Sequence, residues 1–323
     1  MKDSHGRTIN YLRLSITDRC NLRCCYCMPD KGVAIKNCDE ILSYEGMLRI
    51  VKAAAALGIR KVRVTGGEPL VRRGVISFLY QLSCTQGIEE VTLTTNGLLL
   101  EEMAGDLRRA GVSRLNISLD SLEEETFAMI TRGGNLQKVK SGLAAAEDEG
   151  LKIKLNMVVM RGVNDHEIGR FARLTLSKPW SVRFIEYMPT IREPQWRDRI
   201  VTGGEVLGRL KEDFELQSLS TDRYCGPAKP YRISGAKGTV GIITPMSDHF
   251  CGDCNRIRVT STGRGKSCLL NETALDLKPY LHSADDNLLR MALQDVIDGK
   301  PRQHRIAEGQ DLGAVFSMAE IGG

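Results

Sequence analysis

Residues 11–27 read YLRLSITDRCNLRCCYC, and this stretch joins the two features that decide the fold. Apolar and polar side chains alternate over residues 11–16, which is the period-two pattern of a β-strand. Three cysteines then follow within eight residues, in the spacing C-x3-C-x2-C: Cys20, Cys24 and Cys27. The sequence therefore predicts a strand that delivers a cysteine-rich loop at its carboxyl end.

The same strand-and-helix unit repeats along the first two thirds of the chain. We predict further strands over residues 61–65, 90–95, 114–119, 152–159 and 181–187, and helices over residues 44–57, 75–82, 98–110, 136–149 and 167–176. Strands separated by one helix pair in parallel through right-handed crossovers. Six units predict an α/β fold, a partial (β/α)6 TIM-like barrel, in which chemistry gathers at the carboxyl ends of the strands.

The pattern changes after about residue 190. We predict a helix over residues 203–213, short strands over 231–233 and 240–243, and a late helix over 287–298. We therefore divide the 323 residues into a barrel, residues 1–190, and a C-terminal region, residues 191–323. This region carries a second cysteine group with the spacing C-x2-C-x13-C: Cys251, Cys254 and Cys268.

Composition narrows the class of protein. Hydrophobic residues make up 42% and charged residues 26%, which is ordinary for a globular protein. No apolar run approaches the roughly 20 residues of a membrane span, and the N-terminus lacks the apolar core of a signal peptide, so we expect a cytoplasmic protein without membrane contact. A net charge of +5 and 5% aromatic residues give little support for nucleic-acid binding.

Cysteines in such a compartment favour metal binding over disulfides. Each three-cysteine group supplies three thiolates, which can hold three irons of a cubane and leave the fourth iron open to a small ligand. Zinc is the competing metal, but structural zinc sites are closed by four ligands. The isolated cysteines, Cys38, Cys84 and Cys225, are expected to be buried in apolar packing.

Several ordered motifs carry a family resemblance. CNLRCCYC at residues 20–27 and TGGEP at residues 65–69 resemble the radical S-adenosylmethionine enzymes, where glycines in the second motif let the backbone approach the methionine amino group. LRLSITDRCN, YCMPD, VRVTGGEPLVRR, TTNG, LNISLDSL, VNDHEI, RFIEYM, FCGDCNRIRV and the terminal IGG are similar, over essentially the whole chain, to the GTP 3′,8-cyclase family of molybdenum cofactor biosynthesis.

The resemblance implies a lyase. Such an enzyme uses S-adenosylmethionine and two [4Fe–4S] clusters to convert GTP to (8S)-3′,8-cyclo-7,8-dihydroguanosine 5′-triphosphate, the first step of molybdopterin synthesis. The clusters are assigned to Cys20, Cys24 and Cys27 and to Cys251, Cys254 and Cys268. S-adenosylmethionine contacts are assigned to Tyr26, Gly67, Ser118 and Met188. GTP contacts are assigned to Arg13, Arg63, Thr95, Lys154, Arg256 and Arg258, with Arg13, Arg256 and Arg258 as catalytic residues.

The residues themselves agree with this assignment. Arg256 and Arg258 alternate on a predicted strand, so they face the same side, and guanidinium pairs suit a triphosphate. Other cations on barrel strands would be costly to bury without an anion. His166 and His249 are expected to have surface or structural roles.

The family also implies partners: an external electron donor such as a flavodoxin or ferredoxin, the next pathway enzyme, cyclic pyranopterin monophosphate synthase, and a homodimer as a common assembly. It implies that the tail ending Gly322-Gly323 reaches the active site, whereas the plain alternative is a flexible terminus. Two other functions stay open: a radical enzyme that matures a peptide, and a non-enzymatic iron–sulfur or zinc protein that binds nucleic acid.

Overall fold

The computed structural model describes residues 1–29, 31–32, 34, 36–188, 196–220, 226–271, 273–283, 285–303 and 318–322. Its strands are β1 (Tyr11–Ser15), β2 (Lys61–Thr65), β3 (Glu90–Thr95), β4 (Arg114–Ser118), β5 (Lys152–Val159), β6 (Ser181–Glu186), β7 (Leu216–Ser218), β8 (Lys229–Ile233), β9 (Thr239–Ile243), β10 (Arg256–Val259), β11 (Arg264–Lys266) and β12 (Leu275–Asp276). They form one 12-stranded sheet in the order β12-β11-β10-β1-β2-β3-β4-β5-β6-β9-β8-β7.

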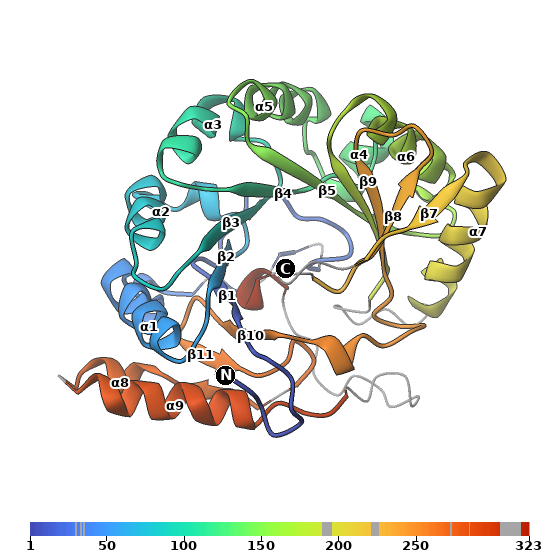
Figure 1. Ribbon diagram of the computed structural model, residues 1–323. Helices are drawn as coiled ribbons and strands as arrows, with labels where there is room; N and C mark the ends of the chain where they lie inside the picture. Colours follow the sequence, from blue (N-terminus) through green and yellow to red (C-terminus); the bar gives the residue numbers. More distant parts are fainter. Residues whose placement is uncertain are drawn as a thin grey trace.

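Its helices are α1 (Tyr44–Ala56), α2 (Val75–Ser83), α3 (Leu100–Arg109), α4 (Glu124–Thr131), α5 (Leu136–Asp148), α6 (Ile168–Ser177), α7 (Gly203–Asp213), α8 (Lys278–Leu281), α9 (Asp286–Asp298) and α10 (Met318–Ile321). Strands β1 to β6 pair in parallel, neighbour to neighbour, and the predicted partial (β/α)6 barrel is confirmed. Helices α1, α2, α3, α5 and α6 cover the outer side of the curved sheet (Figure 1).

The barrel helices form for the reasons that the sequence suggests. The Ser43 side chain caps α1 by accepting a hydrogen bond from the Gly46 amide, and the predicted apolar face of this helix is buried. The Thr202–Glu205 capping box starts α7. Helix α4 was not predicted. It lies between β4 and α5, and its end contacts the first cysteine loop through the carbonyls of Ile130 and Thr131.

The C-terminal region extends both edges of the barrel sheet. Strand β9 adds to β6 and strand β10 adds to β1, both in parallel, and antiparallel hairpin strands follow outside them. Helix α9 packs against α1, so the C-terminal region also covers the first barrel helix. The boundary near residue 190 stays a prediction, and the two parts share one sheet.

Two expectations about local burial are wrong. Cys38 and Cys84 are exposed rather than packed in the core, and Cys225 lies outside the described residues. The flexible-terminus alternative also fails for the described tail, because α10 lies inside the ring of strands (Figure 1) and Gly322 is buried. Gly323 lies outside the described residues.

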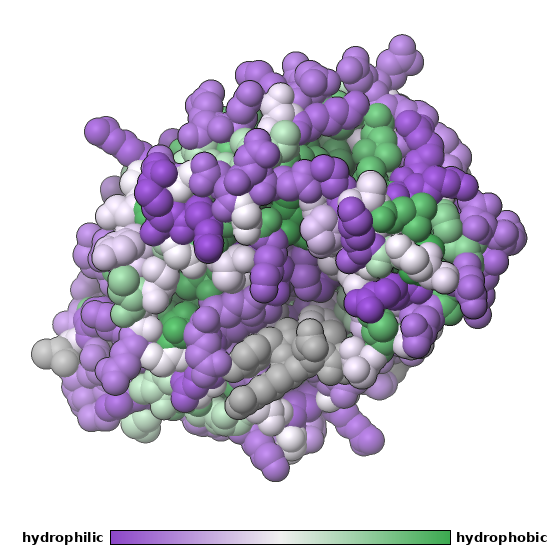
Figure 2. All heavy atoms as spheres, turned by 45° about the horizontal axis from the view of Figure 1, so that its top comes forward, coloured by the Kyte–Doolittle hydropathy of each residue, from purple (hydrophilic) through white to green (hydrophobic). Residues whose placement is uncertain are grey.

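The outer surface is mostly hydrophilic in the view of Figure 2, where hydrophobic residues show as separate patches. In the described part of the chain, none of the helices has the length and apolar run that a bilayer crossing needs. The apolar core instead lies between the sheet and its covering helices.

Candidate functional site

Both cysteine groups line one cavity of about 310 Å³, which we call the main cavity because it contains both groups. It lies inside the barrel and is lined from the carboxyl ends of β1 to β6, from β10 and from the tail helix α10. Except for Lys154, all of the predicted site residues line it: Arg13, Cys20, Cys24, Tyr26, Cys27, Arg63, Gly67, Thr95, Ser118, Met188, Cys251, Cys254, Arg256, Arg258 and Cys268. The structure therefore brings together two motifs that lie more than two hundred residues apart in the chain.

The first cysteine loop is held by backbone hydrogen bonds. The Cys27 amide donates to the Cys24 carbonyl at 2.9 Å, which closes a turn between two of the three thiols, and the Cys25 amide donates to the Ile130 carbonyl at 2.8 Å. Cys25 itself packs beside a small apolar cluster that contains Ile130, Met160 and Tyr187. Cys25 is not among the residues that line the cavity, in contrast to Cys20, Cys24 and Cys27.

Burial makes these thiols poor acids when no metal is bound. It raises the pKa of Cys20 to about 11 and the pKa of Cys27 to about 12. The nearby Glu68 and Asp120 carboxylates and the neighbouring thiols act in the same direction. Burial and the negative charge of neighbouring groups disfavour the thiolate form of each cysteine. A cationic metal that replaces the protons would compensate this negative charge. The donor set thus fits a metal cluster.

The two glycines of the GGEP motif serve a contact that the sequence did not indicate. A Cβ on Gly67 would lie 2.3 Å from the Arg19 carbonyl oxygen, and a Cβ on Gly66 would lie 2.6 Å from the Thr17 carbonyl oxygen. The Gly67 amide donates to this Thr17 oxygen at 2.8 Å. The close backbone approach in this structure is therefore to the first cysteine loop. The S-adenosylmethionine contact of Gly67 stays a prediction.

Glu68 is a site residue that sequence reasoning missed. Its carboxylate accepts hydrogen bonds from the Thr95 hydroxyl at 2.8 Å and the Asn96 amide at 2.7 Å. Burial raises the pKa of Glu68 to about 7 although these hydrogen bonds lower it. The Asn96 side chain in turn donates to Asn21 at 2.7 Å. Glu68 thus ties the ends of β2 and β3 together beside the cysteine loop, and this link already occupies the Thr95 hydroxyl.

The surroundings of the second cysteine group carry more positive charge than those of the first. Cys251 begins a short 3-10 helix (Cys251–Asp253), Cys254 follows it, and Cys268 comes just after β11. Burial would raise the pKa of Cys254, but the Arg256 and Lys300 cations outweigh burial and lower it to about 6. Arg256 also donates to the Cys254 sulfur at 3.8 Å. The thiolate is the form of cysteine that binds metal, so the cations around Cys254 favour metal binding by this residue.

Arginines form a row across three neighbouring strands. In the sheet register, Arg258 on β10 lies opposite Arg13 on β1, and Arg13 lies opposite Arg63 on β2. The Nε atoms of Arg13 and Arg63 are buried and have no hydrogen-bond partner among the described residues. Buried guanidinium groups with unmet donors favour an anionic ligand.

Lys154 faces a different opening. It lines a second cavity, of about 410 Å³, together with Arg114 and Trp180, near the starts of β4 to β6. Burial lowers the pKa of Lys154 to about 6, and Arg183 is the largest of the nearby cations that lower it further. Arg183 itself lines the cavity that holds both cysteine groups, so Lys154 is linked to that cavity only through the electrostatic effect of Arg183. Arg183 was not assigned a role from the sequence.

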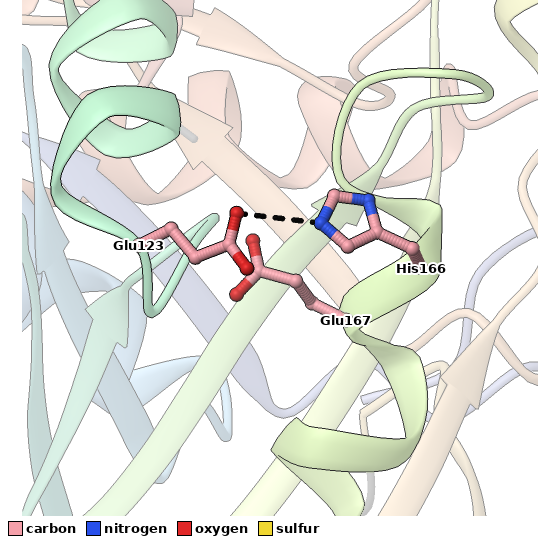
Figure 3. A group of neighbouring side chains, drawn as sticks. All are labelled: Glu123, His166 and Glu167. Atoms are coloured by element: carbon pink, nitrogen blue, oxygen red, sulfur yellow. Dashed lines mark hydrogen bonds and ion pairs between the residues drawn. The ribbon is translucent and has the colours of Figure 1, made fainter.

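A separate polar cluster resembles a metal site but is explained by ion pairs (Figure 3). Ligand atoms of Glu123, His166 and Glu167 lie within 4.8 Å of one another. Arg170 pairs with both carboxylates, and Glu167 accepts a hydrogen bond from the Ser121 hydroxyl at 2.5 Å. The cluster holds the loop after β4, and His166 is exposed, in agreement with the surface or structural role predicted for it.

Comparisons with known proteins agree with this geometry. Residues 14–175 match the Radical SAM superfamily, and residues 180–306 match the Molybdenum Cofactor Synthesis C family. A protein of Geobacter sulfurreducens named GTP 3′,8-cyclase is 54% identical over 99% of both chains, and a protein of the same name from Alkaliphilus oremlandii is 44% identical over 100% of both.

Among solved structures, Streptococcus suis SuiB bound to S-adenosylmethionine superposes with a TM-score of 0.62 at 15% identity, over 90% of this chain and 67% of SuiB. The structure of anSMEcpe with bound AdoMet has a TM-score of 0.58 at 14% identity, over 88% and 81% of the two chains. These two likenesses show the fold alone. The family-model matches and the full-length identities show that the chain belongs to the radical S-adenosylmethionine superfamily and, within it, to the GTP 3′,8-cyclase family.

Proposed function

We propose that the main cavity is the place where this chain converts GTP to (8S)-3′,8-cyclo-7,8-dihydroguanosine 5′-triphosphate, with S-adenosylmethionine at the first cysteine loop and GTP at the second. The observation that carries the proposal is that two separate three-thiol groups line one cavity. A row of arginines, of which Arg63 and Arg258 are buried and Arg13 is partly buried, lies across β10, β1 and β2 in the same cavity.

The residues fit two clusters. Cys20, Cys24 and Cys27 would hold the first cluster, and the C-terminal group would hold the second. Each set offers three thiol ligands, which leaves one iron of a cubane open. When bound, the clusters supply electron transfer and an open iron for each small molecule, and the protein supplies binding, orientation and exclusion of water.

The cations would fix the orientation of GTP. The triphosphate needs several donors, and the row of Arg258, Arg13 and Arg63 offers planar guanidinium groups on one side of the cavity. Arg183 also lines this cavity, and Lys154, which lines the second cavity, lies in the electrostatic field of Arg183, so the negative charge is best placed on this side. The guanine base would then lie toward the Cys251 loop, and the ribose would lie between the two thiol groups.

The opposite wall would receive S-adenosylmethionine. Tyr26, Gly67, Ser118 and Met188 all line the cavity around the first loop. The tail helix α10 lines it as well, through Met318 and Ala319. A reactive radical needs such an enclosed site, because proximity to the substrate competes with quenching by solvent.

The partners implied by the family belong to this proposal as well. A small electron-transfer protein such as a flavodoxin or ferredoxin would reduce the first cluster, and cyclic pyranopterin monophosphate synthase would take the product. A homodimer and a cytoplasmic location stay predictions.

Anaerobic reconstitution tests the proposal. The wild-type chain should hold about eight irons, and Cys251→Ser should hold about four. Cys251→Ser should still cleave S-adenosylmethionine reductively but should form no cyclised nucleotide, as read by product mass. Cys84→Ser is the matched control, because Cys84 is exposed and far from either motif in sequence. Cyclase activity in Cys251→Ser, or only four irons in the wild type, would contradict the proposal.

A further inference from the structure

A buried lysine joins the segments that carry the second cysteine group. Lys300 follows α9, its side chain is buried, and its ammonium donates to the carbonyls of Arg256 and Ser267, both at 2.8 Å. The first carbonyl lies two residues after Cys254, and the second lies one residue before Cys268. One ammonium therefore fixes the spacing between the C-x2-C loop and the third cysteine.

The start of the C-x2-C loop, at Cys251, is tied to the same stretch of chain. The Arg7 guanidinium donates to the Cys251 carbonyl at 2.9 Å and to the Pro301 carbonyl at 2.9 Å. Asp3 holds Arg7 in place through a 2.6 Å ion pair between side chains that are almost fully buried. Residues 300–302 are thus bound to the cysteine-bearing segments by two cations. Lys300 donates to the backbone on one side, and Arg7 joins the Pro301 and Cys251 carbonyls.

The charge of Lys300 lies where the ligands would be negative. Its ammonium interacts with the Cys254 and Cys268 sulfurs, and Lys300 lines the same cavity as those thiols. A buried ammonium is costly without compensation, whereas three thiolates beside it supply that compensation. Two carbonyl acceptors alone would be served as well by a neutral donor, so the choice of a cation points to the cluster.

The first cysteine loop has a counterpart of different chemistry. The Arg132 guanidinium donates to the carbonyls of Arg23 at 3.1 Å and Met28 at 3.0 Å, which flank Cys24 and Cys27. Arg132 itself has a left-handed backbone conformation, with φ of 56°. The two loops are therefore each held by a cation from a distant segment, which allows a reciprocal experiment.

We propose that Lys300 is a positioning residue for the second cluster: it holds the Cys254 and Cys268 segments at the spacing that the cluster needs and favours its reduced form. The proposal rests on the proposed function only in that the second thiol group binds a cluster. Outer groups that orient metal ligands commonly govern affinity and reduction potential.

Two variants separate hydrogen bonding from charge. Lys300→Met removes both, and after anaerobic reconstitution iron should fall from about eight to about four per chain, with only the first cluster kept. Lys300→Gln keeps a donor but removes the charge, so it should retain both clusters. Losing a nearby cation disfavours the reduced cluster, so the second midpoint potential should fall by about 59 mV, a tenfold change in the ratio of reduced to oxidised cluster.

The second cluster is read alone by placing each variant in a chain with Cys20→Ala, Cys24→Ala and Cys27→Ala. Electron paramagnetic resonance then reports its midpoint without overlap from the first cluster. Arg132→Met is the reciprocal variant: both residues have a Cβ, so the left-handed strain is unchanged, and this variant should lose the first cluster and keep the second. Lys237→Met, on an exposed turn of the C-terminal region, should change neither.

Each outcome decides between the alternatives. Eight irons in Lys300→Met, with an unchanged midpoint of the second cluster, would overturn the proposal. Loss of both clusters together with a lowered melting temperature of the apoprotein would overturn it as well, in favour of a general structural role. If Cys251→Ser loses four irons while Lys300→Met does not, the proposed function stands and only this inference fails.

Discussion

The Tyr26 hydroxyl donates a 2.7 Å hydrogen bond to the Asp120 carboxylate, which joins the first cysteine loop to the end of β4. The second Asp120 oxygen accepts a 2.8 Å hydrogen bond from the Val158 amide on β5. Burial raises the pKa of Asp120 to about 6, although both hydrogen bonds lower it. This carboxylate therefore connects the first cysteine loop to two central strands, β4 and β5.

Removal of the Tyr26 hydroxyl should weaken the apoprotein in a pH-dependent way. The Asp120 pKa is raised in the folded state, so the folded carboxyl holds its proton more tightly, and its ionisation costs stability as the pH rises from about 4 to about 6. Tyr26→Phe removes a donor to the ionised form. It should lower the free energy of unfolding by about 1.5–3 kcal/mol at pH 8 and by less at pH 5. Urea denaturation at both pH values measures this.

Tyr187→Phe is the control for that experiment, since Tyr187 is buried in the neighbouring apolar cluster and does not line the cavity. An equal loss at pH 5 and pH 8 in Tyr26→Phe would show that Asp120 is not the group involved.

Gly67→Ala should separate the two loops at the first thiol group. The added Cβ would overlap the Arg19 carbonyl at 2.3 Å, and backbone cannot yield as a flexible side chain does. We expect a loss of about 1–3 kcal/mol in the unfolding free energy of the apoprotein and loss of the first cluster. Gly252→Ala is matched to it, because this glycine lies in the second cysteine loop with nothing within 4 Å of an added Cβ. Retention of eight irons in Gly67→Ala would refute the steric argument.

Gly322→Ala should displace the tail helix α10 from its position in the cavity without changing either cysteine group. Its φ is 81°, and a Cβ would lie 2.0 Å from the Thr65 hydroxyl oxygen, while its carbonyl accepts a 2.5 Å hydrogen bond from Arg258. Cyclisation should fall at least about tenfold, or about 1.4 kcal/mol in activation free energy, with iron content unchanged. Gly208→Ala, at an open position in α7, should be neutral. Wild-type turnover in Gly322→Ala would contradict the role of the tail.

GTP binding should take up about one proton through Lys154. Burial and neighbouring cations lower the pKa of Lys154 to about 6, so the amine is mainly neutral at pH 7.5 before binding. A triphosphate nearby favours the charged form, so the proton is taken up and GTP affinity falls as the pH rises above about 6. Calorimetry in buffers of different ionisation enthalpy measures the uptake.

Lys154→Met should lose the uptake and bind GTP more weakly, whereas Lys152→Met, two residues earlier on the same strand and exposed, should keep both. Binding without proton uptake in the wild type would place the triphosphate elsewhere.

The barrel was largely predictable from sequence because its strands and helices have strong local periodicity. The bounds of β2, β3, β5 and α7 agree with the prediction. Helix α4 was missed because its eight residues follow a loop and show weak amphipathic patterning. The cysteine motifs were found because their spacing is itself the signal.

The missed site residues act through groups that leave no local pattern. Glu68 bonds to β3, Lys300 bonds to backbone carbonyls on two other segments, and Arg132 bonds to the first loop. Every residue has a backbone carbonyl, so the residue type does not show which carbonyls accept such hydrogen bonds. Which carbonyls come close to a side chain depends on how distant strands pair. For Cys84 the residue type was misleading. Cysteine favours burial, but Cys84 lies at the end of α2 and is exposed.

The pairing of β1 with β10 has a consequence for biosynthesis. One edge of β1 pairs with β10, residues 256–259. More than two hundred residues are therefore synthesised after β1 before its partner strand leaves the ribosome. An uncovered parallel edge is a template for mispairing between nascent chains. Any premature stop that removes β10 should yield aggregates rather than a smaller working barrel, however intact the first cysteine motif is.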